Sequence, residues 1–305
     1  MILLIIDHIF DFLFLEPDWI SLSENLILRR FLLLTEPTRT MAYCDVPKSA
    51  SQTWRDTFCN MNAIKWDKRH DCHNALYSKH SLRSTRSDEL AQLNDLNIVK
   101  FMFVRHPLER LASAYNEKFV TPMDKSCVIR EEDTDVPKYD AYINHMRHYQ
   151  KRHMNMNSSN ACLADCSNEF KFSCFVEYVL VATENGETLP NLGKDIHWWP
   201  YTEICSVCKI HYDFIGHVED FQGDLQLLLD KFPDNDALME LYEQKKKIHC
   251  KTNCNGTLGK DAYLKYFHQV TKATILRLYQ RYKNDFVLGG YEFPSKYIAV
   301  GMEDT

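Results

Sequence analysis

The sequence predicts an α/β fold in which helices cover both faces of a central parallel sheet. The apolar run Val99–Val104 is typical of a strand buried on both faces, and Pro107 just after it favours the first turn of a helix. A second short strand at 41–46 is followed by small residues and then by a helical pattern. Strands separated by helical segments indicate a parallel sheet.

The other elements follow from the same patterns. We expect strands near 41–46, 99–104 and 210–216. The expected helices lie near 52–63, 107–119, 139–152, 169–183, 219–231, 236–248 and 261–284. Residues 120–168 are polar and predict an insertion or a lobe on the acceptor side. With 305 residues, of which 45% are hydrophobic, the chain can bury a sizeable core, and we predict one domain over 39–305.

The N-terminal residues 1–38 are apolar but interrupted by charges. Met1–Leu15 is short and contains two aspartates, and two arginines interrupt Leu26–Leu34. A membrane span needs about 20 apolar residues, and charges near its centre are costly. We interpret residues 1–38 as a poor or truncated membrane anchor and stem, or as amphipathic packing helices.

Two strand-to-helix corners carry candidate anion-binding groups. Arg105 follows the strand 99–104 at the mouth of a helix, and Ser113 lies eight residues later, near the same helix face. In an open α/β sheet such corners lie beyond the carboxyl ends of the strands, where ligands bind, and a guanidinium there can grip a phosphate with two hydrogen bonds.

The second corner follows the strand 41–46. Small residues leading into a helix let main-chain N–H groups and the helix dipole converge on one anion. Lys48, Ser49 and Ser51 add side-chain donors. The spacing differs from the G-x-x-x-x-G-K-[ST] loop of nucleoside triphosphatases. The formal net charge of −6 argues against general nucleic-acid binding, so any anion site is built locally.

Taken together, the two strand-to-helix corners resemble motifs of a known family. Val46–Trp54 and Arg105–Tyr115 resemble the 5′-phosphosulfate and 3′-phosphate motifs of the Golgi carbohydrate sulfotransferases related to the HNK-1 and chondroitin/dermatan 4-O-sulfotransferases. His197–Gly216 is similar to the "HW…LC.PC.I.YDFIG" region of that family, and Tyr279–Tyr291 to its C-terminal "Y..DF.LFGY". The resemblance covers most of residues 41–292.

The resemblance implies a fold, a reaction and a location. The fold is the P-loop-like sulfotransferase fold. The reaction moves a sulfuryl group from 3′-phosphoadenosine 5′-phosphosulfate (PAPS) to a hydroxyl of a glycan, either a glycosaminoglycan or another oligosaccharide. We expect no metal requirement. The implied location is the Golgi lumen, as a type II membrane protein.

The resemblance also implies the residues of the site. The PAPS-binding residues are Pro47, Lys48, Ser49, Ala50, Ser51, Gln52, Arg105 and Ser113. Arg105 and Ser113 are assigned to the 3′-phosphate, and Lys48 to the sulfate-bearing end. Lys48 is the catalytic cation, since negative charge builds on the leaving oxygen during transfer.

A general base is needed because a sugar hydroxyl is a poor nucleophile. His197 is the leading candidate, and Glu117, Glu203 and His70 are lesser ones. The rings of Trp198, Trp199 and Tyr201 could stack on sugar rings. Trp54 is expected in the core, and Arg110 is expected to brace its helix against an acidic neighbour.

Some positions depart from the family pattern. Ser49 stands where Val or Thr is usual, and Gln52 where Thr is usual. Both can still donate a hydrogen bond to an anion. Gly289 replaces the usual Phe, and we expect it to weaken the packing there.

Other interpretations of the same residues stay open. Arg105 can form a structural ion pair with Glu109 one turn later, and Lys48 can be a solvated turn residue. A P-loop kinase or nucleotide hydrolase would show magnesium dependence and ATP turnover. A non-catalytic glycan- or nucleotide-binding relative would bind PAPS and transfer nothing.

The eleven cysteines indicate disulfides in a lumenal protein. Cys44, in a predicted strand, is the candidate for a buried free thiol. The alternative is a zinc site made of Cys205-x-x-Cys208 and Cys250-x-x-x-Cys254. Asn157 and Asn255 begin glycosylation sequons in polar stretches that are typical of loops.

Overall fold

The computed structural model describes residues 31–33, 41–64, 69–79, 98–120, 171–184, 196–251 and 263–304. The chain divides into two compact units. The first unit comprises Met1–His106, Pro200–Lys260 and Val287–Tyr291, and the second comprises Pro107–Trp199, Asp261–Phe286 and Glu292–Thr305. A single domain over 39–305 stays a prediction. The expected helix 139–152, both sequon asparagines and nearly all of the expected insertion lie outside the described residues.

A four-stranded sheet in the order β1-β2-β3-β4 lies in the first unit. Its strands are β1 (Phe31–Leu33), β2 (Met41–Cys44), β3 (Val99–Val104) and β4 (Phe214–His217). β2, β3 and β4 run parallel, with Cys44 opposite Met102 and Val104 opposite His217, whereas β1 is antiparallel to β2. The structure confirms the predicted α/β class with a central parallel sheet. The carboxyl ends of β2, β3 and β4 lie at one edge of that sheet.

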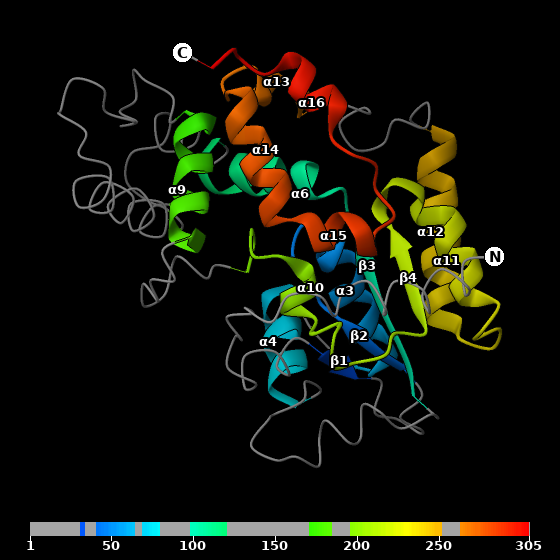
Figure 1. Cartoon of the computed structure of the whole chain (residues 1–305). Helices are drawn as coiled ribbons and strands as arrows, with labels where there is room; N and C mark the ends of the chain where they lie inside the picture. Colours follow the sequence, from blue (N-terminus) through cyan, green and yellow to red (C-terminus); the bar gives the residue numbers. More distant parts are fainter. Residues whose placement is uncertain are drawn as a thin grey trace, which may run out of the picture. The chain divides into compact units, whose positions relative to one another are not determined.

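One face of the sheet packs on helices of the first unit. These helices are α3 (Ser51–Met61), α4 (Arg69–Lys79), α11 (Phe221–Leu229) and α12 (Asp236–Lys251), labelled in Figure 1. Successive residues of a strand point to opposite faces, so Met41, Tyr43, Phe101 and Phe103 share this core. Trp54 of α3 lies fully buried among them, as predicted.

The opposite face of β2 carries Cys44, which forms a disulfide with Cys205 just after α10 (Tyr201–Ile204), with a Cα–Cα distance of 6.0 Å. The prediction that Cys44 is a free thiol is therefore wrong. A zinc site that includes Cys205 is wrong for the same reason, because the disulfide already uses that sulfur. A second disulfide joins Cys59 of α3 to Cys72 of α4. Among the described residues, no cluster of metal-ligating side chains occurs.

The named elements in the described part of the second unit are helices. They are α6 (Pro107–Tyr115) with a π-turn at Asn116–Val120, α9 (Phe172–Glu184), α13 (Leu264–Phe267), α14 (Lys272–Arg281), α15 (Lys283–Leu288) and α16 (Ser295–Val300). α15 ends in the stretch counted with the first unit. Aromatic rings fill the core between α6, α9 and α13: Tyr115, Phe119, Phe172, Phe175 and Tyr266.

Several elements differ from the prediction. Phe31–Leu33 is a strand, so the helical alternative for residues 1–38 is wrong at these three positions. The helix expected at 261–284 is divided, because Thr271 starts a new helix by accepting a hydrogen bond from the Thr274 N–H at 3.2 Å. The helices α4, α10 and α16 were not predicted. In the described part of the chain, no helix is long and apolar enough to span a bilayer.

Candidate functional site

The loop between β2 and α3, residues Asp45–Ala50, begins at the carboxyl end of a parallel strand. Lys48 and Ala50 both have left-handed backbone angles, with φ of 68° and 60°. The Ser49 N–H donates to the Val46 carbonyl at 3.2 Å, which closes the turn. A left-handed conformation is costly for residues with a side chain, so the fold holds this loop in a defined shape.

The first turn of α3 offers main-chain hydrogen-bond donors at this loop. The first hydrogen bond into the helix runs from Trp54 N–H to Ala50 O, at 3.1 Å. The N–H groups of Ser51–Thr53 precede it and have no acceptor within the helix. No side chain caps Ala50. α3 is eleven residues long, so its dipole adds positive potential at the same end.

Ser49 gives an independent sign that the loop takes a ligand. Its side chain is fully buried, and its hydroxyl has no hydrogen-bond partner in the described structure. An unpaired buried hydroxyl costs about 1–3 kcal/mol, which a bound hydrogen-bond acceptor would offset. The loop and the start of α3 therefore have the properties of an anion site.

The structure brings the six predicted residues of this corner together. Pro47 and Ser49 are buried, Lys48, Ala50 and Ser51 are partly buried, and Gln52 is exposed. Ser51 and Gln52 are the first two residues of α3.

A buried ion pair fixes the start of the loop. Asp45 is fully buried, and its carboxylate accepts hydrogen bonds from Arg55 Nε at 3.0 Å and Arg55 Nη2 at 2.9 Å. The Tyr77 hydroxyl donates to the same carboxylate oxygen. Burial lowers the pKa of Arg55, but Asp45 outweighs it, so the net pKa is raised above the usual value.

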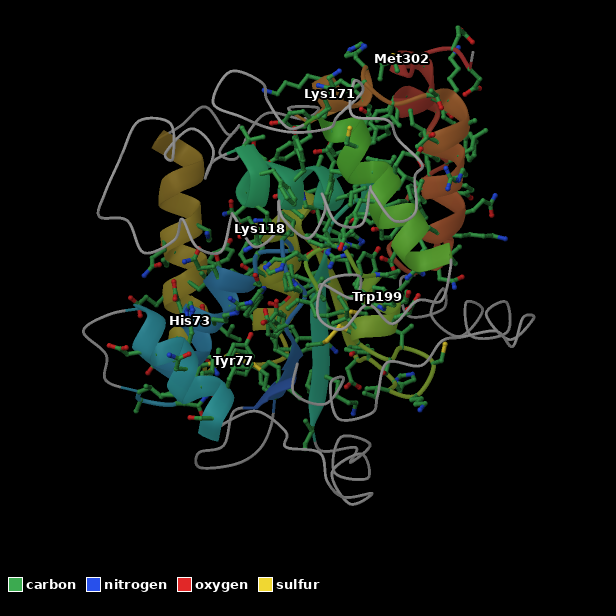
Figure 2. The ribbon with its side chains drawn as sticks, turned by 90° about the vertical axis from the view of Figure 1, so that its left-hand side faces the viewer. His73, Tyr77, Lys118, Lys171, Trp199 and Met302 are labelled. Atoms are coloured by element: carbon green, nitrogen blue, oxygen red, sulfur yellow. A yellow bond between two sulfur atoms is a disulfide. The ribbon has the colours of Figure 1, made fainter. Side chains whose placement is uncertain are left out.

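The helix α4 supports this arrangement from outside the loop. Figure 2 shows His73 and Tyr77 on α4, one turn apart, and they contact Asp56 and Asp45 respectively. His73 Nε2 lies 2.8 Å from Asp56 Oδ1. Sequence reasoning missed this support, although Asp45 is the first residue of the loop. Arg55 and Tyr77 are too far along the chain for spacing alone to connect them to it.

Arg105 follows β3, at the same edge of the sheet. The next residue, His106, donates its N–H to Glu219 Oε1 at 2.8 Å. The Tyr291 hydroxyl donates to Glu219 Oε2 at 3.0 Å. Burial and the Glu219 carboxylate raise the pKa of Tyr291 well above its usual value, while the positive charge of Arg105 opposes them. Glu219 therefore ties the corner that carries Arg105 to the segment Val287–Tyr291.

His217, at the end of β4, forms a second tie that the sequence analysis did not identify. Its Nδ1 lies 3.1 Å from Asp224 Oδ2, and its Nε2 lies 3.0 Å from the Gly289 carbonyl oxygen. Both partners are acceptors, and only the protonated ring donates from both nitrogens. The Asp224 hydrogen bond raises the pKa of His217, partial burial lowers it, and the Gly289 carbonyl adds to the increase.

Gly289 was expected to loosen the packing. A side chain at this position would instead clash with the ring of Tyr291, which occupies the space. The Tyr291 ring also lies edge-on to His106, with centroids 5.2 Å apart. The expectation of weaker packing is wrong because Tyr291 takes the place of the missing side chain.

The other two predicted residues, Ser113 and His197, belong to the second unit. Ser113 is buried on α6. Its joining Arg105 at one phosphate stays a prediction, and so does the approach of His197 to the sulfuryl donor.

His197 is partly buried in the turn Ile196–Trp199, here named the His197 segment. Arg110 of α6 donates through Nη1 to Trp199 O at 2.7 Å and through Nη2 to Ile196 O at 2.8 Å. The Tyr282 hydroxyl donates to Trp198 O. Arg110 thus braces α6 against the His197 segment through main-chain carbonyl groups, while the acidic partner expected for it stays a prediction.

The two tryptophans of the His197 segment do not present free faces. Trp198 is 1% exposed and Trp199 is 4% exposed, and Tyr201 is also buried. The Trp198 ring packs edge-on against Phe175, and the Arg281 guanidinium lies 4.8 Å from the centre of the Trp199 ring. The prediction that these rings stack on sugars is wrong, because they form the wall behind His197.

The lesser candidate bases lie in different surroundings. Glu117 is exposed and pairs with Lys118 at 2.9 Å, and Glu203 is partly buried on α10. Nothing is described of the His70 side chain. Glu109, the expected partner of Arg105, accepts a hydrogen bond from the Tyr297 hydroxyl at 2.7 Å.

Comparison with known proteins finds carbohydrate sulfotransferases among the relatives of this chain. Human carbohydrate sulfotransferase 9 is 25% identical over 274 residues, which are 86% of this chain and 53% of the relative. Human carbohydrate sulfotransferase 10 is 25% identical over 275 residues, or 83% of this chain and 64% of the relative. Carbohydrate sulfotransferase 11 of Danio rerio is 26% identical over 267 residues, which are 86% of this chain and 68% of the relative.

The coverage sets the extent of the likeness. The chain spans about half to two-thirds of the length of these curated relatives. No solved structure matches the chain significantly. Residues 32–292, most of the chain and both strand-to-helix corners, match the sulfotransferase family. The resemblance found in the motifs is confirmed, and the chain belongs to the sulfotransferase family.

Proposed function

We propose that the protein transfers a sulfuryl group from PAPS to a hydroxyl of a glycan. The observation that carries this proposal is the β2–α3 loop, where a fully buried Ser49 hydroxyl without a partner lies beside the N-terminus of an eleven-residue helix. Family membership names the class of reaction, and the loop provides the place for the charged end of the donor.

Two groups of residues are proposed to bind PAPS, and of these residues Ser113 belongs to the second unit. Pro47, Lys48, Ser49, Ala50, Ser51 and Gln52 would surround the sulfate-bearing end, where main-chain N–H groups and hydroxyls act as donors. Arg105 would bind the 3′-phosphate, with Ser113 as a second donor. The parallel pairing of β2 and β3 supports this pair of contacts, because it brings both corners to one edge of the sheet.

Two side chains would act in the reaction itself. PAPS supplies the sulfuryl group when bound, and Lys48 would stabilise the negative charge that builds on the leaving oxygen. His197 would take the proton from the acceptor hydroxyl, which makes that oxygen a better nucleophile. The side chains proposed for these roles need no metal ion.

The proposed acceptor is supported by the names of the relatives, and the proposed location by the resemblance of the motifs. Their names describe carbohydrate sulfotransferases, which supports a glycan acceptor such as a glycosaminoglycan or another oligosaccharide. We place the protein in the Golgi lumen as a type II membrane protein by resemblance. The two disulfides seen in the described part of the first unit support an oxidising compartment.

A transfer assay tests the proposal. Labelled PAPS would be offered with desulfated chondroitin, dermatan, heparan and N-glycan acceptors, and the Lys48→Ala variant would serve as the inactive control. We expect label on one glycan class with the wild-type chain. PAPS binding without transfer to any of them would favour a non-catalytic relative. Magnesium-dependent ATP turnover would favour a kinase or nucleotide hydrolase and overturn the proposal.

A further inference from the structure

Three of the four carbonyl groups in the His197 segment are held by side chains. Arg110 binds those of Ile196 and Trp199, and Tyr282 binds that of Trp198. These two side chains come from α6 and from the end of α14, so two separate elements grip one short turn. Such a grip fixes the main chain on both sides of His197.

The burial of Arg110 is costly and needs an explanation. Its side chain is 1% exposed, and removing a guanidinium from water costs several kcal/mol unless its donors are paired. An apolar side chain of similar length would fill the same volume without that cost. What an apolar side chain cannot do is bind two carbonyl groups at once. The geometry therefore indicates a role in position rather than in packing.

The indole rings complete the grip. Trp198 packs against Phe175 and Tyr178 of α9, and Trp199 lies against Arg281. Both tryptophans are buried. His197, which directly precedes Trp198 in the chain, stays partly exposed. Three carbonyl groups of the segment and the two indole rings are held in place. The direction in which the His197 side chain leaves the main chain is therefore fixed as well.

We propose that Arg110 is a positioning residue that holds His197 in its working orientation. The inference rests on the proposed role of His197 as general base. It also gives the Arg105–Tyr115 motif a second task, since the helix that follows the phosphate-binding arginine holds the catalytic histidine. A base displaced by about 1 Å can lose about 100-fold in rate, so an arginine that touches no reactant can control turnover.

Nuclear magnetic resonance of the full chain tests the orientation without an acceptor. The imidazole Cε1–Hε1 signal of His197 is identified by its absence in His197→Gln. In Arg110→Met we expect this signal to move towards the chemical shift of an exposed, mobile histidine side chain. Arg277→Met is the matched control, because Arg277 pairs with Glu177 of α9 at 3.1 Å. The control should leave the His197 signal in place.

Tyr282→Phe provides a milder variant in case Arg110→Met does not fold. It removes only the hydroxyl that binds Trp198 O, so the His197 signal should move in the same direction by a smaller amount. An unmoved His197 signal in a folded Arg110→Met or Tyr282→Phe chain would overturn the inference.

Turnover on the glycan found in the acceptor assay tests the consequence. We expect Arg110→Met to lower kcat about 100-fold and to leave the KM for PAPS unchanged. In a His197→Gln background the same change should cost nothing further, since Arg110 acts through His197. Independent losses that multiply would overturn the positioning role. Full turnover by His197→Gln would instead remove the proposed base, while PAPS-dependent transfer itself would still stand.

Discussion

The β2–α3 loop and the His197 segment each carry a candidate catalytic side chain, but their main chains are used in opposite ways. In the loop, N–H groups at the start of α3 lack intrahelical acceptors and a buried Ser49 hydroxyl lacks a partner. In the His197 segment, carbonyl groups are bound by Arg110 and Tyr282. The loop is built to receive an anion, whereas the segment is built to hold one imidazole still.

Mutations in the β2–α3 loop and in the His197 segment should therefore have different effects. A change in the loop should alter PAPS binding or the charge at the leaving oxygen. A change around the His197 segment should alter turnover and leave PAPS binding as it was.

Lys48→Ala should give the largest effect on the reaction. We expect kcat to fall about 100- to 1000-fold, because the variant loses the charge that stabilises the leaving oxygen. Affinity for adenosine 3′,5′-bisphosphate should change much less. Steady-state kinetics and calorimetry on the same preparation measure both. Equal losses in kcat and affinity would mean that Lys48 only binds.

Arg55→Met should destabilise the first unit. The change leaves the fully buried Asp45 carboxylate without its cation, and such losses cost about 3–5 kcal/mol in the free energy of unfolding. Chemical denaturation measures this. The double variant Asp45→Asn/Arg55→Met should recover part of the loss, since it removes the stranded charge. A single variant as stable as the wild type would show that the ion pair does not fix the loop.

Ser49→Ala should separate stability from binding. Removing a buried hydroxyl without a partner should leave the free energy of unfolding unchanged or higher. The affinity for adenosine 3′,5′-bisphosphate should fall about tenfold, as for a lost hydrogen bond to a charged group.

Thr57→Val is the matched control for Ser49→Ala. The Thr57 hydroxyl is buried in α3, the helix that follows the Ser49 loop, and it donates a hydrogen bond to Thr53 O at 2.9 Å. This control should lose stability and keep its affinity. Ser49→Ala with wild-type affinity would contradict an anion at the loop.

His217→Gln should have the smallest effect, and only at low pH. The folded-state pKa of His217 is raised, mainly by Asp224, so its contribution to stability is complete below the unfolded pKa of about 6.5 and is lost as pH rises through the folded value. For this partly exposed pair we expect at most about 1 kcal/mol. Denaturation at pH 5.5 and 8.5 checks this. A larger loss at pH 8.5 would contradict the assigned charge.

The parts of the fold that sequence predicts best are those with local signals. The strand Val99–Val104 and the helix starting at Pro107 appear where expected. A long apolar run indicates a buried strand, and a proline favours the first turn of a helix, so both signals are local. The three-residue strand β1 exists only through its pairing with β2, so no local pattern predicts it. α4 has few apolar residues to mark a helix in the sequence, and Cys72 joins it to α3 by a disulfide.

The same distinction applies to the candidate site. Lys48, Ser49 and Arg105 follow strand ends, which a sequence can show. The Cys44–Cys205 disulfide spans 161 positions, so spacing could not predict it. The burial of Trp198 and Trp199 depends on α9 and on Arg281, which are distant in the chain. The sequence does not distinguish a tryptophan that packs in the protein interior from one that is exposed and stacks on a sugar ring.

Calorimetry of nucleotide binding tests most directly the central claim, that the two strand ends form one PAPS site. Wild-type chain and Arg105→Ala would be titrated with adenosine 3′,5′-bisphosphate and with adenosine 5′-monophosphate, which lacks the 3′-phosphate. We expect Arg105→Ala to weaken bisphosphate binding by at least about tenfold, through the loss of charge-assisted hydrogen bonds, and to leave monophosphate binding unchanged. Unchanged bisphosphate affinity in the variant would contradict the site.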